Sequence, residues 1–214
     1  MNGKHLNGLC KVLNVFQDTV RMDYPAVIDK THVMMCEVKP TPMFGIECKD
    51  GLDVSKIQKM KIEDECFDVS IENGRYVLKN EARTYSFLLT DAESLNEPKV
   101  PKLDPEGVIE TDAKTLSNAV EKCILVSDYC TIQNGRMSAK NDVTDVSVVL
   151  GKDDGSGCRS RYALDYLKKI AKVMVGDVRI YFDTNYPMKM CWFDGYYEYS
   201  VFLAPRIDNK GVKE

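Results

Sequence analysis

The predicted order of helices and strands occurs twice along this chain, and this repetition constrains the fold more than any other feature. Amphipathic helices are expected to start near Lys4 and Asp53, and again near Ala113 and Tyr162, so the two starts lie about 49 residues apart in each half. The segments between them mostly alternate polar and apolar residues, as strands with one buried face do. Residue identity between the halves is weak, so the repetition predicts two domains of similar topology.

The strands are best marked by alternation and by turn residues. Asn73-Gly74 is typical of a hairpin turn, and Asp183-Thr184-Asn185 and Asp194-Gly195 are typical of turns in the second half. The strands expected around these turns are 67–71, 75–79 and 82–89 in the first half, and 178–182, 188–193 and 197–203 in the second. Each half therefore combines several strands with two helices, which predicts an α+β fold.

Each predicted helix has one apolar face and one face that carries lysine. In the first helix, from Lys4 to about Val15, Leu6, Leu9 and Leu13 share the apolar side. Lysine is favoured at exposed helix positions in any soluble protein, so one lysine alone indicates little. Their collective excess is more informative, because the chain has 33 Asp and Glu against 29 Lys and Arg. The lysines on the polar faces are Lys4, Lys11, Lys56, Lys59, Lys114, Lys122, Lys168, Lys169 and Lys172.

A proline-rich segment separates the halves. Pro98, Pro101 and Pro105 favour extended backbone and exclude a helix or a central strand. The boundaries expected from this are a first domain at 1–95, a connector at 96–106, a second domain at 107–207 and a tail at 208–214. The connector is either a plain linker or an exposed strap whose apolar residues, Val100 and Leu103, close one wall of a groove.

Composition and cysteine spacing exclude several classes of protein. The eight cysteines are scattered without a C-x-x-C pair, and neither histidine, His5 or His32, has a cysteine at the spacing of a zinc site. We therefore expect no metal, and we expect the cysteines to act as small core residues in a reducing compartment. No apolar run is long enough to cross a bilayer and no signal-peptide pattern follows Met1, so we expect an intracellular protein without a membrane partner.

The sequence gives little support for an enzyme or for a cofactor. The glycine-rich stretch 151–157 lacks the Gly-Lys-Ser/Thr ending of a P-loop, and no H-E-x-x-H or G-x-S-x-G motif is present. The acidic run Glu63-Asp64-Glu65 offers ligands for a metal-dependent nuclease, but a solvated turn is the simpler interpretation. We therefore expect no catalytic residues and no cofactor.

Five short segments, in order along the chain, form a recognisable pattern: 28–33, 97–100, 162–167, Pro187 and 202–207. Together they resemble the sliding clamps of archaeal and eukaryotic DNA replication, the proliferating cell nuclear antigen family. Ile28–Val33 is similar to the D-x-x-H-V segment of the first domain, and Glu97–Val100 to the start of the archaeal connector. Tyr162–Leu167 stands where the family has its last helix. Pro187 and the ending Phe202–Ile207, which contains Leu-Ala-Pro-Arg-Ile, match the C-terminal signature. The resemblance spans nearly the whole chain and is that of a short, archaeal-type member.

The resemblance implies a DNA-clamp fold with two topologically similar domains, sheets outside and two helices per domain on the inner face. It implies a homotrimeric ring that encircles double-stranded DNA without sequence preference, serves as a polymerase processivity factor in replication and repair, and is not an enzyme. The nine helix lysines would face the DNA, and an acidic outer surface would keep DNA away from the sheets. DNA polymerase, clamp loader, flap nuclease and ligase would bind through short peptide motifs.

The same resemblance implies a partner-binding groove and a subunit interface. The matching groove positions are Ile28, His32, Val33, Met35, Val100, Leu103, Pro187, Phe202, Ala204, Pro205 and Ile207. The alternative is that these are ordinary core or strand-edge residues, with His32 a hydrogen-bonded structural histidine. The interface would pair edge strands from neighbouring subunits. Its matching positions are Tyr85, Phe87, Leu89, Val146, Val148 and Leu150.

The chain also departs from the family pattern. It is shorter than usual, and the first helix starts so soon after Met1 that the first domain lacks an opening strand. This leaves the oligomeric state open between a homotrimer, a mixed ring containing a clamp subunit of viral or plasmid origin, and a monomer. A protein-interaction scaffold that never encircles DNA is a further alternative.

Overall fold

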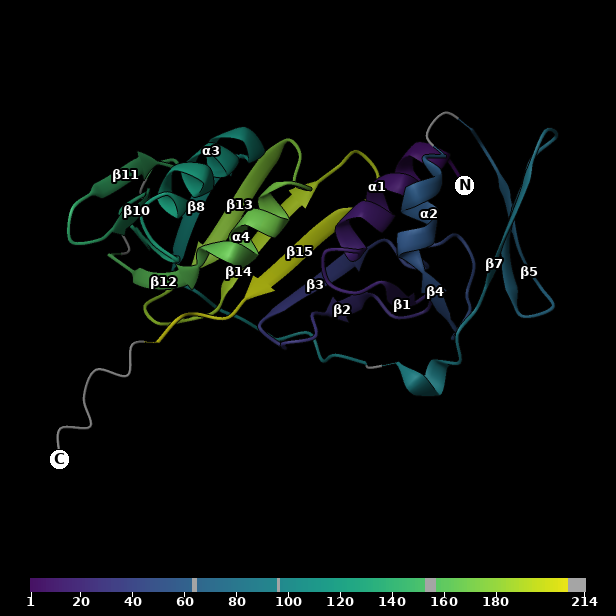
Figure 1. Ribbon diagram of the computed structural model, residues 1–214. Coiled ribbons are helices and arrows are strands. Elements are labelled where there is room, and N and C mark those ends of the chain that lie inside the picture. Colours follow the sequence, from purple (N-terminus) through teal and green to yellow (C-terminus); the bar gives the residue numbers. More distant parts are fainter. Residues whose placement is uncertain (63–64, 96, 153–156, 208–214) are drawn as a thin grey trace. The chain divides into compact units, whose positions relative to one another are not determined.

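The computed structural model describes residues 1–62, 65–95, 97–152 and 157–207 (Figure 1). Glu63 and Asp64 of the acidic run, part of the glycine-rich stretch, and the tail from Asp208 onward lie outside the described residues. The chain forms two compact units, the first made of Met1–Pro101 with Gly195–Tyr199, and the second of Lys102–Asp194 with the segment from Ser200 onward.

The first unit begins with a helix, and its described strands pair in three groups. Strand β1 pairs with β4, β2 with β3, and β6 lies between β5 and β7, all antiparallel. The elements are α1 (Gly3–Leu13), β1 (Thr19–Arg21), β2 (Ala26–Ile28), β3 (Met34–Lys39), β4 (Gly51–Asp53), α2 (Val54–Met60), β5 (Asp68–Glu72), β6 (Arg75–Lys79), β7 (Thr84–Leu88) and a 3-10 turn (Ala92–Ser94).

The described part of the second unit contains two sheets and two helices. One sheet has the strand order β11-β10-β9-β12, and the other runs β15-β14-β13-β8. Helix α3 packs against β8, β9, β10 and β11, while α4 packs against β9 and β12. The elements are β8 (Gly107–Asp112), α3 (Ala113–Ile124), β9 (Tyr129–Gln133), β10 (Arg136–Lys140), β11 (Asp145–Val149), β12 (Arg159–Ala163), α4 (Leu164–Ala171), β13 (Asp177–Phe182), β14 (Met188–Phe193) and β15 (Glu198–Leu203).

The structure confirms the α+β class and the repeated order of elements. Each unit has a long helix that packs against a shorter one, α1 on α2 and α3 on α4. Carboxylate side chains cap two of these helices, since Asp53 accepts a hydrogen bond from the Lys56 N–H and Asp112 accepts one from the Thr115 N–H. The units differ at their starts: β8 precedes α3 and pairs with β13, whereas α1 begins at Gly3.

Two predicted boundaries were wrong. The last helix begins at Leu164, because Tyr162 still belongs to β12, where it pairs with Cys130 of β9 and donates a hydrogen bond from its hydroxyl to the Tyr186 carbonyl at 2.9 Å. Strand β7 begins at Thr84, after Ala82. The Asn80 side chain accepts hydrogen bonds from the backbone N–H groups of residues 82 and 83, which holds this segment in a turn.

Gly195–Tyr199 belongs with the first unit, although the sequence places it in the second domain. The Tyr197 hydroxyl donates a hydrogen bond to the Met43 carbonyl at 2.7 Å, and the rings of Tyr196 and His5 stack with centroids 4.6 Å apart. Hydrogen bonding and aromatic packing therefore attach this turn to elements that lie far earlier in the chain.

The core of each unit lies between its helices and its sheets. Leu6, Leu9 and Leu13 of α1 are fully buried, as the apolar face of that helix predicts. Cys10, Cys36, Cys123, Cys130 and Cys158 are buried, whereas Cys66 is exposed. Within the described part of the chain, no helix is long and apolar enough to span a membrane.

Candidate nucleic-acid interface

Helix α4 of the second unit presents a lysine-rich surface because its apolar and polar residues separate cleanly. Leu164, Leu167 and Ile170 are almost completely buried, whereas Lys168 and Lys169 are exposed, and Lys172 is exposed at the C-terminal cap. Positions 168, 169 and 172 lie on one helix face, since residues three and four apart are neighbours. Cations near the C-terminal end of a helix also interact favourably with its dipole.

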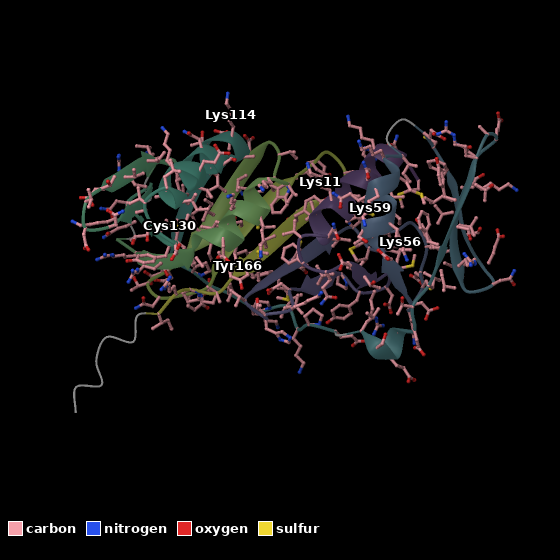
Figure 2. The ribbon with its side chains drawn as sticks, in the orientation of Figure 1. Lys11, Lys56, Lys59, Lys114, Cys130 and Tyr166 are labelled. Carbon is pink, nitrogen blue, oxygen red and sulfur yellow. The ribbon has the colours of Figure 1, made fainter. Side chains whose placement is uncertain are left out.

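The partner helix α3 adds exposed lysines at both of its ends. Lys114 and Lys122 are eight residues apart and therefore lie on the same side of the helix, with Asn118 between them. Leu116, opposite, is buried. Figure 2 labels Lys114 on α3 and Tyr166 on α4. The second unit thus contains two packed helices whose solvent faces carry all five of its predicted DNA-facing lysines.

The helices of the first unit are arranged in the same way. Lys4 and Lys11 of α1 are seven residues apart, two helical turns, and both are exposed. The Asn14 side-chain amide donates a hydrogen bond to Gln58 Oε1 at 2.8 Å, which joins the end of α1 to α2. Lys59 on α2 is also exposed (Figure 2).

Lys56 forms an ion pair with a carboxylate at the start of its own helix. Its Nζ lies 3.0 Å from an oxygen of Asp53, the N-cap of α2. Part of its charge is therefore already balanced within the helix. Conversely, Lys61 is exposed at the C-terminal cap of α2, in left-handed backbone. Sequence reasoning missed Lys61, although its place just after the last apolar helical residue was the available signal.

Few acids share these helix faces. Asp165 on α4 and Glu121 on α3 are the carboxylates within the four helices, all of which lie in the described ranges. Because the whole chain has more acidic than basic residues, the lysines on the helices leave the remaining surface strongly acidic on average. A lysine-covered helix pair can attract phosphate by charge alone, without reading bases.

One predicted groove segment in the first unit is organised by a buried carboxylate. Asp29 is 8% exposed and accepts hydrogen bonds from the backbone N–H groups of Thr31, Val33 and Met34 and from the Thr31 hydroxyl. Burial raises the pKa of Asp29, but these hydrogen bonds outweigh burial and leave that pKa lowered. Asp29 thus fixes the loop that carries His32, and sequence reasoning did not identify this role.

The predicted groove residues of the first unit differ in accessibility. His32 is exposed and has left-handed backbone at φ 58°. Ile28 and Val33 are half-buried. Met35 is buried inside its own unit, so its side chain supports the loop and does not offer contact surface.

The connector starts against the first unit. The Tyr24 hydroxyl donates a hydrogen bond to the Pro98 carbonyl at 3.1 Å, and Arg21 forms ion pairs with Asp23 and Glu97. Val100 and Leu103 are both half-buried. The connector is therefore extended, as its prolines predict, and it is anchored by side chains near its start.

The C-terminal segment of the second unit continues from Ala204, after the end of β15, and a backbone hydrogen bond joins it to β12. The Arg206 N–H donates a hydrogen bond to the Arg161 carbonyl on β12 at 2.7 Å. Phe202 is buried and Pro205 half-buried, whereas Ala204 is exposed and Ile207 is 65% exposed. Pro187, just before β14, is half-buried. The segment thus presents an exposed isoleucine on backbone that a hydrogen bond holds in place.

The predicted interface strands lie at sheet edges. β7 pairs only with β6 and β11 only with β10 among the described strands. Phe87 and Leu150 are buried within their own units, so these two residues pack inward and their side chains are not free for a neighbour. Tyr85, Leu89, Val146 and Val148 are half-buried.

The most exposed apolar side chains on these strands are ones that sequence reasoning missed. Leu88 on β7 is 66% exposed and Val149 on β11 is 54% exposed. Successive strand residues point to opposite faces, so these neighbours of Phe87 and Leu150 face solvent. Solvent-facing apolar residues on an edge strand favour pairing with another chain.

One group of side chains in the second unit has the composition of a metal site. The ligand atoms of Glu106, Cys158 and Asp183 all lie within 4.8 Å of one another. The Cys158 thiol donates a hydrogen bond to Asp183 at 3.3 Å, and the pKa of Asp183 is lowered by the Thr184 backbone N–H and then by this thiol. Carboxylates are preferred by magnesium, calcium and manganese, whereas thiolates are preferred by zinc and copper(I), so this mixed set of ligands does not match one class of metal. Elsewhere, burial raises the pKa of the Cys123 thiol to about 11, which disfavours metal-binding thiolate.

Comparison with known proteins agrees with this geometry. No protein-family model matches the chain. It is 26% identical over 183 residues to the DNA polymerase sliding clamp of Methanosarcina barkeri, covering 76% of this chain and 74% of that protein. It is 24% identical over 213 residues to that of Methanococcoides burtonii, covering 85% and 84%.

Solved structures show the same fold. A complex of the C-terminal region of FEN-1 with PCNA from A. fulgidus contains a chain that matches with a TM-score of 0.85 and 23% identity, over 98% of both chains. PCNA from Thermococcus kodakaraensis matches with a TM-score of 0.76 and 19% identity, over 96% of this chain and 98% of that one. The chain therefore has the fold of the proliferating cell nuclear antigens, and its sequence is similar to those of archaeal DNA polymerase sliding clamps.

Proposed function

We propose that this protein is a processivity factor whose chains close into a ring of three around double-stranded DNA. The observation that supports this most strongly is the lysine surface, since each unit has two packed helices with lysine-bearing solvent faces. Closed rotational symmetry is the rule for soluble oligomers, and three two-unit chains make a ring of six similar units. Its role is mechanical and needs no catalytic residue.

Lysine contacts of this kind suit a protein that must slide. An ammonium group at the end of a flexible stem makes a weak, non-directional contact with phosphate, and it can pass from one phosphate to the next. Base readout would instead need side chains fixed against groove edges. The proposed interface therefore holds duplex DNA without regard to sequence and lets the tethered polymerase advance.

The C-terminal segment 204–207 is the proposed docking point for partner peptides. Ile207 offers an exposed apolar side chain next to backbone that the Arg206 hydrogen bond fixes. A fixed, apolar surface lowers the entropic cost of binding an extended peptide. The similarity to the PCNA chain in the FEN-1 complex supports a flap nuclease as one partner. We propose polymerase, clamp loader and ligase as further partners.

Replacing Ile207 with alanine should weaken peptide binding about tenfold, the effect of losing one apolar contact of roughly 1–1.5 kcal/mol. The measurement is calorimetric titration with a synthetic peptide of the C-terminal region of A. fulgidus FEN-1. Val143→Ala is the matched control, because Val143 is an exposed aliphatic side chain in the turn between β10 and β11. Equal affinities for Ile207→Ala and the unchanged chain would place the peptide elsewhere.

Light scattering at micromolar concentration should give a mass near three chains. Replacing Leu88 with alanine should weaken this assembly about tenfold, because edge-strand pairing would bury its exposed side chain. Met60→Ala serves as control, since Met60 is an exposed apolar residue on α2. A single-chain mass at every concentration tested would exclude the homotrimer and favour a non-encircling scaffold or a mixed ring.

A further inference from the structure

The sheet β11-β10-β9-β12 has an unusual outward face. Cys130, Ile132 and Met137 are fully buried on the side where α3 and α4 pack. Their strand neighbours therefore face away from the helices. Most of these neighbours are polar, and Arg136 together with Arg159 and Arg161 of the adjacent strand β12 gives this face positive charge. The expectation of acidic sheet surfaces therefore does not hold for this part of the sheet.

The strand register gathers the outward side chains into rows. One row across β12, β9 and β10 is Arg161, Thr131 and Ser138, and the next is Arg159, Gln133 and Arg136. Arg159 and Arg161 are two residues apart on one strand, so they share a face and their backbone positions are about 6–7 Å apart. Two arginines of β12 thus share this face, each paired across the ladder with a polar residue of β9.

This face is hollowed. A cavity of about 730 Å³ opens over the sheet, and its lining includes Arg159, Arg161, Thr131, Ser138, Gln133 and Lys140. Asp142 contributes the carboxylate of the lining, and Ala139 is its aliphatic residue. The cavity is therefore polar, carries more positive than negative charge, and is the size of a small-ligand site.

An aromatic residue at one side of the cavity is covered by guanidinium groups. The Arg161 Cζ lies 3.8 Å from the centroid of the Tyr129 ring, and the Arg206 Cζ lies 4.8 Å from the same centroid. The hydrogen bond from the Arg206 N–H to the Arg161 carbonyl holds the C-terminal segment beside them. Guanidinium planes and aromatic rings are the surfaces on which unpaired bases stack.

We propose that this hollow binds single-stranded nucleic acid, with phosphates on Arg159 and Arg161 and bases against the cluster of Tyr129, Arg161 and Arg206. Phosphate oxygens are commonly held by arginine together with serine, threonine and glutamine side chains, and all of these line the cavity. A peptide partner would instead need a large apolar anchor pocket, and Ala139 is too small to form one. This site lies on the sheet face away from the lysine-bearing helices, and it does not depend on ring closure.

The test is fluorescence anisotropy of a labelled 20-nucleotide oligo-dT with the full chain at about 0.1 M salt. Removing two phosphate contacts should raise the dissociation constant of Arg159→Gln/Arg161→Gln about 10- to 30-fold and reduce the salt slope by about 1.4. Arg159→Gln alone leaves the contact between Arg161 and Tyr129 intact and should raise the dissociation constant about fivefold. The single variant therefore tests the site without altering the packing around Tyr129. Circular dichroism and thermal melting check that each variant is folded.

Matched controls separate this site from the helices. Arg75→Gln/Lys79→Gln removes two exposed charges from β6 and should change oligo-dT binding by less than about twofold. Lys168→Gln/Lys169→Gln/Lys172→Gln should weaken binding of a linear duplex and leave oligo-dT bound. The proposal is overturned if the unchanged chain does not bind oligo-dT. It is equally overturned if Arg159→Gln/Arg161→Gln binds oligo-dT as tightly as the unchanged chain does. It is also overturned if replacing Arg159 and Arg161 weakens binding of an octaglutamate peptide but does not weaken binding of oligo-dT.

Discussion

Replacing Lys168, Lys169 and Lys172 together with glutamine should lower the affinity for a linear duplex about 100-fold at about 0.1 M salt. Each lysine that neutralises a phosphate contributes about 0.9 to the slope of log K against log salt, so three contacts account for a change of this order. The measurement is anisotropy of a labelled duplex at several salt concentrations. In a primer-extension assay, the same variant should shorten the products made by a clamp-dependent polymerase.

The control for this result is a variant with the same change in charge at another place. Lys39, Lys49 and Lys79 are exposed and lie outside the four helices, so their replacement by glutamine tests whether net charge alone matters. We expect the control to bind duplex within about threefold of the unchanged chain, because exposed charges beyond a Debye length are screened. Comparable losses in both variants would mean that DNA does not contact α4 in particular.

Replacing Asp29 with alanine should lower the free energy of unfolding by about 3 kcal/mol. The substitution leaves three buried or half-buried N–H groups without their acceptor, and hydrogen bonds to a charged group are among the stronger ones in proteins. Urea unfolding followed by circular dichroism measures the loss. Asp68→Ala, at an exposed position on β5, is the control and should change stability by less than about 0.5 kcal/mol.

The same carboxylate predicts a pH dependence. Because the pKa of folded Asp29 is lowered from its ordinary value of 3.8, its stabilising effect is complete above that value and is lost as the pH falls through the lowered pKa. Asp29→Asn keeps one acceptor oxygen but cannot titrate, so its stability should fall less steeply below pH 4. This role would be contradicted if the free energy of unfolding fell equally steeply with decreasing pH in Asp29→Asn and in the unchanged chain.

Much of this fold follows from local sequence patterns. The spacing of Leu6, Leu9 and Leu13 determines which side of α1 is buried, and Asp53 and Asp112 mark helix starts, because periodicity and capping act within a few residues. The lysine faces follow from the same periodicity. Pro98, Pro101 and Pro105 determine an extended connector through their fixed backbone angles alone.

Contacts between distant segments decided the rest. Tyr162 extends a strand because β9 is there to pair with it, and Gly195–Tyr199 joins the first unit through Met43 and His5. The loop around Asp29 and the arginine-lined face of β12 depend on which groups meet in space. Local patterns set which face of an element is buried, whereas strand pairing and long-range hydrogen bonds select among partners that no local spacing identifies.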